Sequence, residues 1–212
     1  MLRSHQESAD RARTAIEARQ HDPSYFREAL LEVPPSERDA WLDRVLGIQE
    51  LPNDGPELPS GCVPYLPCPV DALLRVIDHA PMRSSDVFVD VGSGVGRAMI
   101  FAHLITGASA IGVEVQPALV QAAQELTTRL HLRRISSQAG DATQMTGPLT
   151  SHPVFFLYCP FSGSRLQAWL ARLEELRTRP FTVCTVDLPL PPQRFLTLGA
   201  SPHPSVSIYR ST

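Results

Sequence analysis

The stretch VFVDVGSGVGRA, residues 87–98, decides the fold. It starts as a short apolar strand that reaches Asp90, continues through glycines at positions 92, 94 and 96, and enters a helix near Arg97. Glycine suits such a turn because the chain bends tightly and a ligand must approach where a Cβ atom would collide. The exposed amides at the start of the helix favour acceptor or anionic groups. The stretch therefore predicts a strand–turn–helix cradle for a nucleotide.

The sequence after the cradle alternates between strand-like and helical stretches. The strand-like runs are VFVDV, AIGVEV, RISSQAGD, VFFLYCPF and FTVCTVDL. This alternation is typical of βαβ units in a parallel sheet with both faces covered. Two further runs, RFLTLGA and SVSIYRST, joined by residues 201–204, indicate a closing hairpin. We predict an α/β, doubly wound, mostly parallel seven-stranded sheet with a C-terminal antiparallel hairpin.

The first 60 residues have a different character. Residues 1–50 divide into two or three helical stretches, and residues 51–69 hold six prolines and two glycines, which excludes regular helix or central strand. A helix follows from Val70 and stops at Pro81. We expect a small N-terminal helical appendage and Pro-rich linker over 1–60, and a ligand-binding domain over 61–212.

Composition restricts the partners. The chain has 212 residues and a net charge of −3, so nucleic acid is disfavoured. No apolar run approaches the roughly 18 residues of a membrane span, and the charged N-terminus resembles no secretory signal. The spacing of the four cysteines matches no zinc pattern, so we expect no metal and a cytoplasmic, reduced protein. The sequence does not indicate the oligomeric state.

Two acidic residues end the next two strands. Glu114 lies about 20 residues past the glycine loop, where a carboxylate can accept hydrogen bonds from both hydroxyls of a ribose. Asp141 can accept from an exocyclic adenine amine, while the amide of Ala142 donates to the ring. Taken singly, each could be a capping or turn residue. Their common place at the carboxyl ends of consecutive strands favours one ligand site.

The loop also bears on the choice of cofactor. A dinucleotide-binding G-x-G-x-x-G loop needs glycine or alanine at position 97, where this chain has Arg97. Asp90 ahead of the loop suits the ammonium of an amino acid and would repel a pyrophosphate. A nicotinamide-dependent oxidoreductase is therefore the weaker alternative.

These motifs resemble those of class I S-adenosylmethionine (SAM) dependent methyltransferases. DVGSGVG is similar to the family's D-x-G-x-G-x-G motif, GVEVQP to its second acidic motif and GDA to its third, and the resemblance covers about residues 61–212. It implies that the loop holds the methionyl part of SAM, Glu114 the ribose and Asp141 the adenine. The cofactor-binding residues predicted with it are Tyr65, Asp90, Gly92, Ser93, Gly94, Gly96, Glu114, Val115, Gln116, Asp141 and Ala142.

The inclusion of Tyr65 rests on a narrower resemblance. GCVPYLPCPVDALLRVID, residues 61–78, resembles the Y-x-P-[ST]-P segment of small protein-lysine methyltransferases and of histone lysine methyltransferases without a SET fold. In that subgroup the tyrosine closes over SAM, but Cys68 replaces the expected serine or threonine. Tyr65 either contributes to the cofactor site or packs the loop.

The end of the fourth strand should lie nearest the transferred methyl group. Related amine methyltransferases often carry [DN]-P-P-[YFW] there, and this chain has Tyr158-Cys159-Pro160-Phe161. A carbonyl of Tyr158 or Cys159 could accept from an amine. A thiolate nucleophile at Cys159 is less favoured than a packing cysteine. Asp187, at the end of the fifth strand, either acts as a base or ends the strand.

We therefore expect a SAM-dependent methyltransferase that acts on a nitrogen or oxygen. Because SAM carries an activated sulfonium, the protein has mainly to align the acceptor and remove a proton. A protein side chain is preferred over a small molecule as acceptor. The departure at Cys159 also leaves open a non-catalytic partner protein with the same fold.

Overall fold

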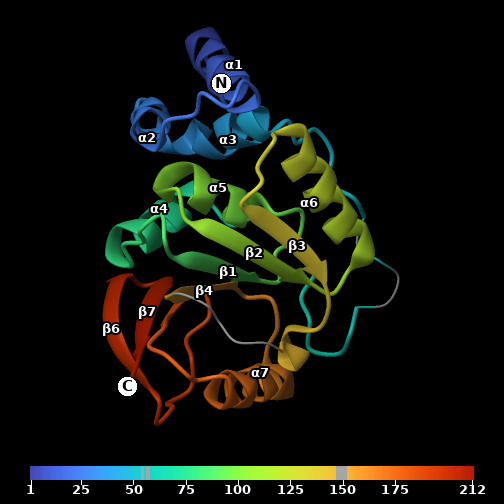
Figure 1. Cartoon of the computed structure of the whole chain (residues 1–212), viewed down its shortest axis with the longest axis vertical. Helices are drawn as coiled ribbons and strands as arrows, with labels where there is room; N and C mark the ends of the chain where they lie inside the picture. Colours follow the sequence, from blue (N-terminus) through green and yellow to red (C-terminus); the bar gives the residue numbers. More distant parts are fainter. Residues whose placement is uncertain (54, 56–57, 147–151) are drawn as a thin grey trace.

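A seven-stranded sheet organises the chain (Figure 1). The structure is a computed structural model that describes residues 1–53, 55, 58–146 and 152–212. The strand order is β3-β2-β1-β4-β5-β7-β6, with β1 to β5 parallel and β7 antiparallel between β5 and β6. The strands are β1 Val87–Val91, β2 Ser109–Glu114, β3 Ile135–Ala139, β4 Pro153–Tyr158, β5 Thr182–Val186, β6 Leu196–His203 and β7 Val206–Ser211. The predicted α/β sheet with its antiparallel hairpin is confirmed.

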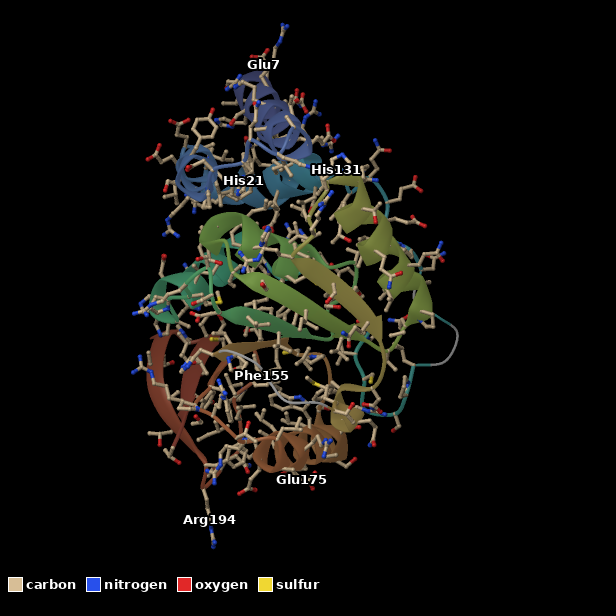
Figure 2. The ribbon with its side chains drawn as sticks, viewed as in Figure 1. Glu7, His21, His131, Phe155, Glu175 and Arg194 are labelled. Atoms are coloured by element: carbon tan, nitrogen blue, oxygen red, sulfur yellow. The ribbon has the colours of Figure 1, made fainter. Side chains whose placement is uncertain are left out.

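Helices cover both faces of this sheet (Figure 1). Those of the sheet domain are α4 Val70–His79, α5 Arg97–Thr106, α6 Pro117–Arg129 and α7 Gly163–Glu175, with a 3₁₀ turn at Ala142–Gln144. The first three lie on one face and α7 on the other. Phe155 lies between β4 and α7, with its ring centroid 6.0 Å from that of Trp169 (Figure 2). Burial on both faces explains the nearly continuous apolar run in β4.

The closing hairpin differs from its prediction in one respect. Residues 201–203 were expected in a loop, yet β6 continues through them to His203 before the chain turns into β7. The strand lies at the edge of the sheet, where Pro202 need not donate to an outer neighbour. The β6–β7 register has two irregularities, one on either side of Ala200.

The predicted N-terminal helices pack onto the sheet domain over α5 (Figure 1). They are α1 Arg3–Glu17, α2 Pro23–Leu31 and α3 Arg38–Leu46, with a 3₁₀ turn at Pro35–Glu37. Phe26 and Trp41 are buried, with ring centroids 5.4 Å apart, in a core shared with α4, α5 and α6. The division near residue 60 stays a prediction. Within the described ranges, no helix is long and apolar enough to cross a bilayer.

Gly112 in β2 marks a close contact between the sheet and the glycine loop. A Cβ atom at this position would lie 2.5 Å from Ser93 Oγ and 2.8 Å from Met99 Sδ. We predict that Gly112→Ala lowers the free energy of unfolding by about 1–3 kcal/mol, measured by urea denaturation. Gly140→Ala is the matched control, because its Cβ would meet no described atom within 4 Å. Equal losses in the two variants would contradict the close packing.

Candidate functional site

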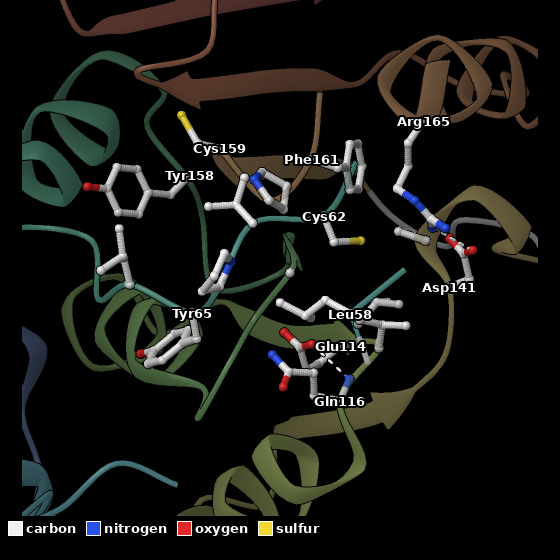
Figure 3. Close-up of a pocket in the computed structure, with 18 of the residues that line it drawn as sticks. Leu58, Cys62, Tyr65, Glu114, Gln116, Asp141, Tyr158, Cys159, Phe161 and Arg165 are labelled. Carbon is white, nitrogen blue, oxygen red and sulfur yellow. Dashed lines mark hydrogen bonds and ion pairs between the residues drawn. The ribbon is translucent and has the colours of Figure 1, made fainter. Parts of the chain in front are cut away.

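A cavity of about 190 Å³ lies at the carboxyl edge of the sheet (Figure 3). Its walls come from the ends of β2, β4 and β5, the turn after β3, and residues 58–66, which we call the cover segment. Most of the predicted cofactor residues line it: Tyr65, Gly92, Glu114, Val115, Gln116, Asp141 and Ala142. The three predicted catalytic residues, Tyr158, Cys159 and Asp187, line it as well. The structure thus brings ten of the fourteen predicted residues to one cavity.

The other four predicted residues do not line this cavity. Asp90 and Ser93 line a smaller adjoining pocket, which shares Tyr65 and Tyr158 with the main cavity. Gly94 and Gly96 line neither of these two pockets. Both have positive φ angles, +53° and +81°, so they shape the backbone of the loop.

The glycine loop has positive φ angles and very little free space. Gly92 has φ +77°, and a Cβ there would lie 2.5 Å from Cβ of Pro160. Gly94 has φ +53°, and a Cβ there would lie 1.9 Å from Cε2 of Tyr65. Both positions therefore exclude a side chain. The ring of Tyr65 packs on the loop and also lines the cavity, so its two sequence-based interpretations are compatible.

Asp90 is a buried carboxylate at the end of β1. It is 3% exposed, and its Oδ2 has no hydrogen-bond partner among the described residues. Burial, and then the nearby charge of Glu114, raise the pKa of Asp90 to about 7. A buried acceptor without a partner is costly, and a cationic group placed against it would relieve that cost. The position is suited to the ammonium of an amino acid.

Glu114 is also buried, but it is held by the backbone. Its Oε2 accepts from the amide of Gly94 at 2.9 Å, and its Oε1 accepts from the amide of Gln116 at 2.9 Å (Figure 3). Two carboxylate oxygens offer about four acceptor positions, so room remains for two hydroxyl donors. Sequence analysis missed the contact with Gly94, which ties the end of β2 to the glycine loop.

Asp141 has partners on both of its oxygens. Oδ1 accepts from the amide of Thr143 at 2.9 Å and from its hydroxyl at 2.8 Å. Oδ2 accepts from Nη1 of Arg165 at 2.6 Å. Although partial burial raises it, the hydrogen bonds from Thr143 and Arg165 leave the pKa of Asp141 lowered overall. Sequence analysis did not identify Arg165, since it lies 24 residues away on α7.

Arg97, just after the loop, forms a buried hub between three segments. Its Nε donates to Oδ1 of Asp43 at 2.6 Å and its Nη2 to Oδ1 of Asp39 at 2.7 Å, both on α3. Its Nη1 donates to the carbonyl of Cys68 at 2.6 Å, just before α4. The side chain is 3% exposed. The sequence signal that could have revealed this hub is the pair of acids four residues apart on α3.

The predicted catalytic residues follow the ends of β4 and β5. Cys159 and Asp187 have φ angles of 42° and 52°, so both strands end in left-handed turns. The thiol of Cys159 donates to the carbonyl of Asp187 at 2.8 Å. Burial, and then the charge of Asp187, raise the pKa of the Cys159 thiol, which disfavours a thiolate nucleophile. Figure 3 shows Tyr158 and Cys159 on one side of the cavity.

The cover segment is attached to the chain after β4. Cys62 pairs with Phe161 in an isolated antiparallel bridge, and the amide of Val63 donates to the carbonyl of Pro160 at 3.1 Å. The amide of Ser162 donates to the carbonyl of Gly61 at 3.0 Å. Residues 58–66 of the Pro-rich stretch therefore cover the cavity. Residues 54, 56 and 57 of that stretch lie outside the described residues.

Comparisons with known proteins agree with this architecture. The family model "Histone methylation protein DOT1" matches residues 67–138, about a third of the chain. An RNA methyltransferase from Salinibacter ruber, solved with S-adenosyl-L-homocysteine, is similar at 23% identity and a TM-score of 0.57, covering 69% of this chain and 92% of that one. A structure described as "Conversion of a Disulfide Bond into a Thioacetal Group during Echinomycin Biosynthesis" is similar at 14% identity and a TM-score of 0.53, covering 66% and 80%. A search of curated proteins found no match.

The chain thus has the fold of class I SAM-dependent methyltransferases, and the matched family model covers its glycine loop and its second acidic strand end. The strand order supports this class against the nicotinamide alternative. Dinucleotide-binding sheets have the order 3-2-1-4-5-6, whereas here the antiparallel β7 is inserted between β5 and β6.

The raised pKa of Asp90 predicts a pH-dependent stability. The pKa of Asp90 is about 7 in the folded protein and has an ordinary value of 3.8, so between these pH values the folded protein binds one proton more than the unfolded chain. The free energy of unfolding therefore falls as the pH rises toward 7. We predict that Asp90→Asn raises the free energy of unfolding by roughly 2 kcal/mol more at pH 8 than at pH 5. Urea denaturation at the two pH values measures this difference. A pH-independent effect would contradict the assignment.

Mutation of the acids that pair with buried Arg97 should destabilise the protein more than mutation of an exposed ion pair. Replacing Asp39 and Asp43 together by asparagine leaves a buried guanidinium without its charge partners, and should cost about 3–5 kcal/mol of unfolding free energy. Adding Arg97→Met to this double variant should recover part of the loss. The control is Asp10→Asn, which breaks the exposed pair with Arg44 and should cost less than about 1 kcal/mol. Equal costs in the two urea denaturation series would refute the hub.

Proposed function

We propose that this protein binds SAM in the cavity and transfers its methyl group to a nitrogen or oxygen, with a protein side chain preferred over a small molecule. The observation that carries the proposal is the set of three acids at consecutive strand ends, each in a different state of hydrogen bonding. Asp90 has an oxygen without a partner, Glu114 has spare acceptor positions, and Asp141 is ion-paired. An amino-acid ammonium, two ribose hydroxyls and an adenine amine match these three states in that order.

The remaining cofactor residues have supporting roles in this proposal. Gly92 and Ser93 supply the tight loop beside Asp90, and Gly94 and Gly96 let the backbone turn into α5. Val115, Gln116 and Ala142 provide walls beside the ribose and adenine. Tyr65 covers the glycine loop at the junction of the two pockets. SAM supplies a methyl group on a sulfonium, an electrophile that needs no further activation.

The acceptor would approach beside Tyr158 and Asp187. A backbone carbonyl of Tyr158 or Cys159 would accept from the attacking amine or hydroxyl and orient it, since the Cys159 thiol is already engaged with the carbonyl of Asp187. Asp187 is exposed at the rim of the cavity and would attract a cationic acceptor or receive its proton. All three residues are proposed as the catalytic set.

Three observations bear on the class of acceptor. The matching family model is described as a histone methylation protein, which favours a protein side chain. The similar structure from Salinibacter ruber is an RNA methyltransferase, which favours RNA. The net charge of −3 weighs against a polyanion. Protein is therefore the acceptor we propose, in a reduced, cytoplasmic setting.

Transfer of labelled methyl groups tests the activity. The full chain is incubated with methyl-labelled SAM and a cell lysate separated into protein, RNA and small-molecule fractions. We expect label in the protein fraction, and its loss with Asp187→Asn. The chain contains no lysine, so methyl-lysine in the products comes from an acceptor and not from the enzyme. Label in RNA alone would refute the acceptor, and SAM binding without transfer would favour the non-catalytic partner protein.

The ribose role of Glu114 gives a quantitative prediction. Glu114→Ala should weaken SAM binding by roughly 1.5 to 3 kcal/mol, because it removes charge-assisted hydrogen bonds. Calorimetry measures the affinity, and Glu125→Ala is the control, because Glu125 is an exposed acid on α6 that contacts Gln121. A melting curve of each variant checks the loss of the Gly94 contact. Unchanged SAM affinity in a folded Glu114→Ala protein would refute the role.

A further inference from the structure

Arg165 reaches two parts of the cavity wall at once. It lies in the first turn of α7, with its side chain 18% exposed. Its Nη1 donates to Oδ2 of Asp141 at 2.6 Å, and its Nε donates to the carbonyl of Ser60 at 3.2 Å. The first contact is on the turn after β3 (Figure 3), and the second is on the cover segment. One guanidinium thus joins two segments that are 81 residues apart in the sequence.

The donors around Asp141 limit what it can still accept. A carboxylate offers about four acceptor positions, two on each oxygen. Thr143 fills both positions on Oδ1, with its amide and its hydroxyl. Arg165 fills one position on Oδ2. A single position therefore remains on Oδ2, which matches a ligand that presents one N–H donor.

The hydrogen bond from Arg165 to Ser60 lies where the cover segment is attached to the chain after β4. The cover segment has backbone contacts with the chain after β4 at Gly61, Cys62 and Val63. The Arg165–Ser60 hydrogen bond is next to these contacts and adds a side chain to them. Loss of Arg165 would therefore remove a partner of Asp141 and a contact of the cover segment together.

We propose, on the basis of the proposed function, that Arg165 is a positioning residue for the purine of the cofactor. It fixes the carboxylate of Asp141 so that one acceptor position on Oδ2 meets the exocyclic amine, and it holds the cover segment over that end of the cavity. The pair thereby selects a 6-aminopurine over a 6-oxopurine, whose oxygen faces the carboxylate without a donor. Cofactor selectivity and cofactor retention then depend on the same side chain.

The chemistry of arginine suits these two tasks. A guanidinium presents several N–H donors in a fixed planar fork, so it can serve two acceptors in different directions. The ammonium of lysine is a single point charge on a flexible stem. Arg165→Lys should therefore keep the charge near Asp141 but lose the contact with Ser60.

The test compares two ligands and two arginine variants in the full chain. Calorimetry gives the Kd of S-adenosylhomocysteine and of S-inosylhomocysteine, which carries oxygen in place of the exocyclic amine. We expect the unchanged protein to prefer the adenosyl ligand by about tenfold or more, the range for one hydrogen bond to a charged group. Arg165→Met should reduce this preference below about threefold. The control Arg177→Met, at an exposed arginine that contacts the carbonyl of Thr212, should keep the preference.

Stopped-flow measurement of the dissociation rate separates retention of the ligand from selectivity for its exocyclic amine. Arg165→Met should release S-adenosylhomocysteine faster than the unchanged protein, and Arg165→Lys should also release it faster while keeping much of the preference for the amine. Melting curves confirm that each variant is folded. If Arg165→Met weakens both ligands equally, Arg165 has only a structural role and the inference fails.

A pH series adds a readout that a merely structural role would not change. Arg165 is one of the groups that lower the pKa of Asp141. Without it the carboxylate becomes protonated at a higher pH. Because Asp90 titrates in both proteins, the readout is the affinity of Arg165→Met for S-adenosylhomocysteine relative to that of the unchanged protein, which should fall as the pH is lowered. A relative affinity that does not change with pH would contradict the inference. If the unchanged protein binds neither ligand, the proposed function itself fails, whereas binding with selectivity intact in Arg165→Met overturns the inference alone.

Discussion

Arg97 donates from three of its nitrogens to α3 and to the segment before α4, and the geometry of the cavity depends on this buried contact. A charged side chain that is 3% exposed has to be paired, so these segments are held to the start of α5. The same arrangement brings Tyr65 against Gly94. The N-terminal helices are therefore part of the scaffold of the glycine loop as well as an addition to the fold.

A second constraint is the convergence of strand ends at one edge of the sheet. Parallel strands place Asp90, Glu114 and Asp141 at neighbouring positions, but their surroundings make them chemically different. Asp90 is the carboxylate whose pKa is raised to about 7, while the pKa of Asp141 is lowered. A ligand with distinct cationic, hydroxyl and amine groups can thus be bound in one orientation. Under the proposed function, the three acids would set the orientation of the ligand as well as its affinity.

Much of this architecture was predictable from the sequence because it rests on local patterns. The alternation of strands and helices, the loop around Gly94 and the acids at strand ends each follow from short-range chemistry. The contacts of Arg97 with α3 and the ion pair of Asp141 with Arg165 could not be predicted from the sequence, because each joins residues far apart in the chain. The hairpin loop was expected at residues 201–204, and β6 can continue through Pro202 because the strand lies at the edge of the sheet. The contact between the Cys159 thiol and the carbonyl of Asp187 also joins residues far apart in the chain, so no local pattern indicates it.

The central claim is that this cavity accepts an S-adenosyl amino acid and not a dinucleotide. Calorimetric titration of the full chain with S-adenosylhomocysteine, and separately with NAD, tests it most directly. The account predicts one S-adenosylhomocysteine bound per chain and no measurable binding of NAD. Binding of NAD without binding of S-adenosylhomocysteine would contradict it.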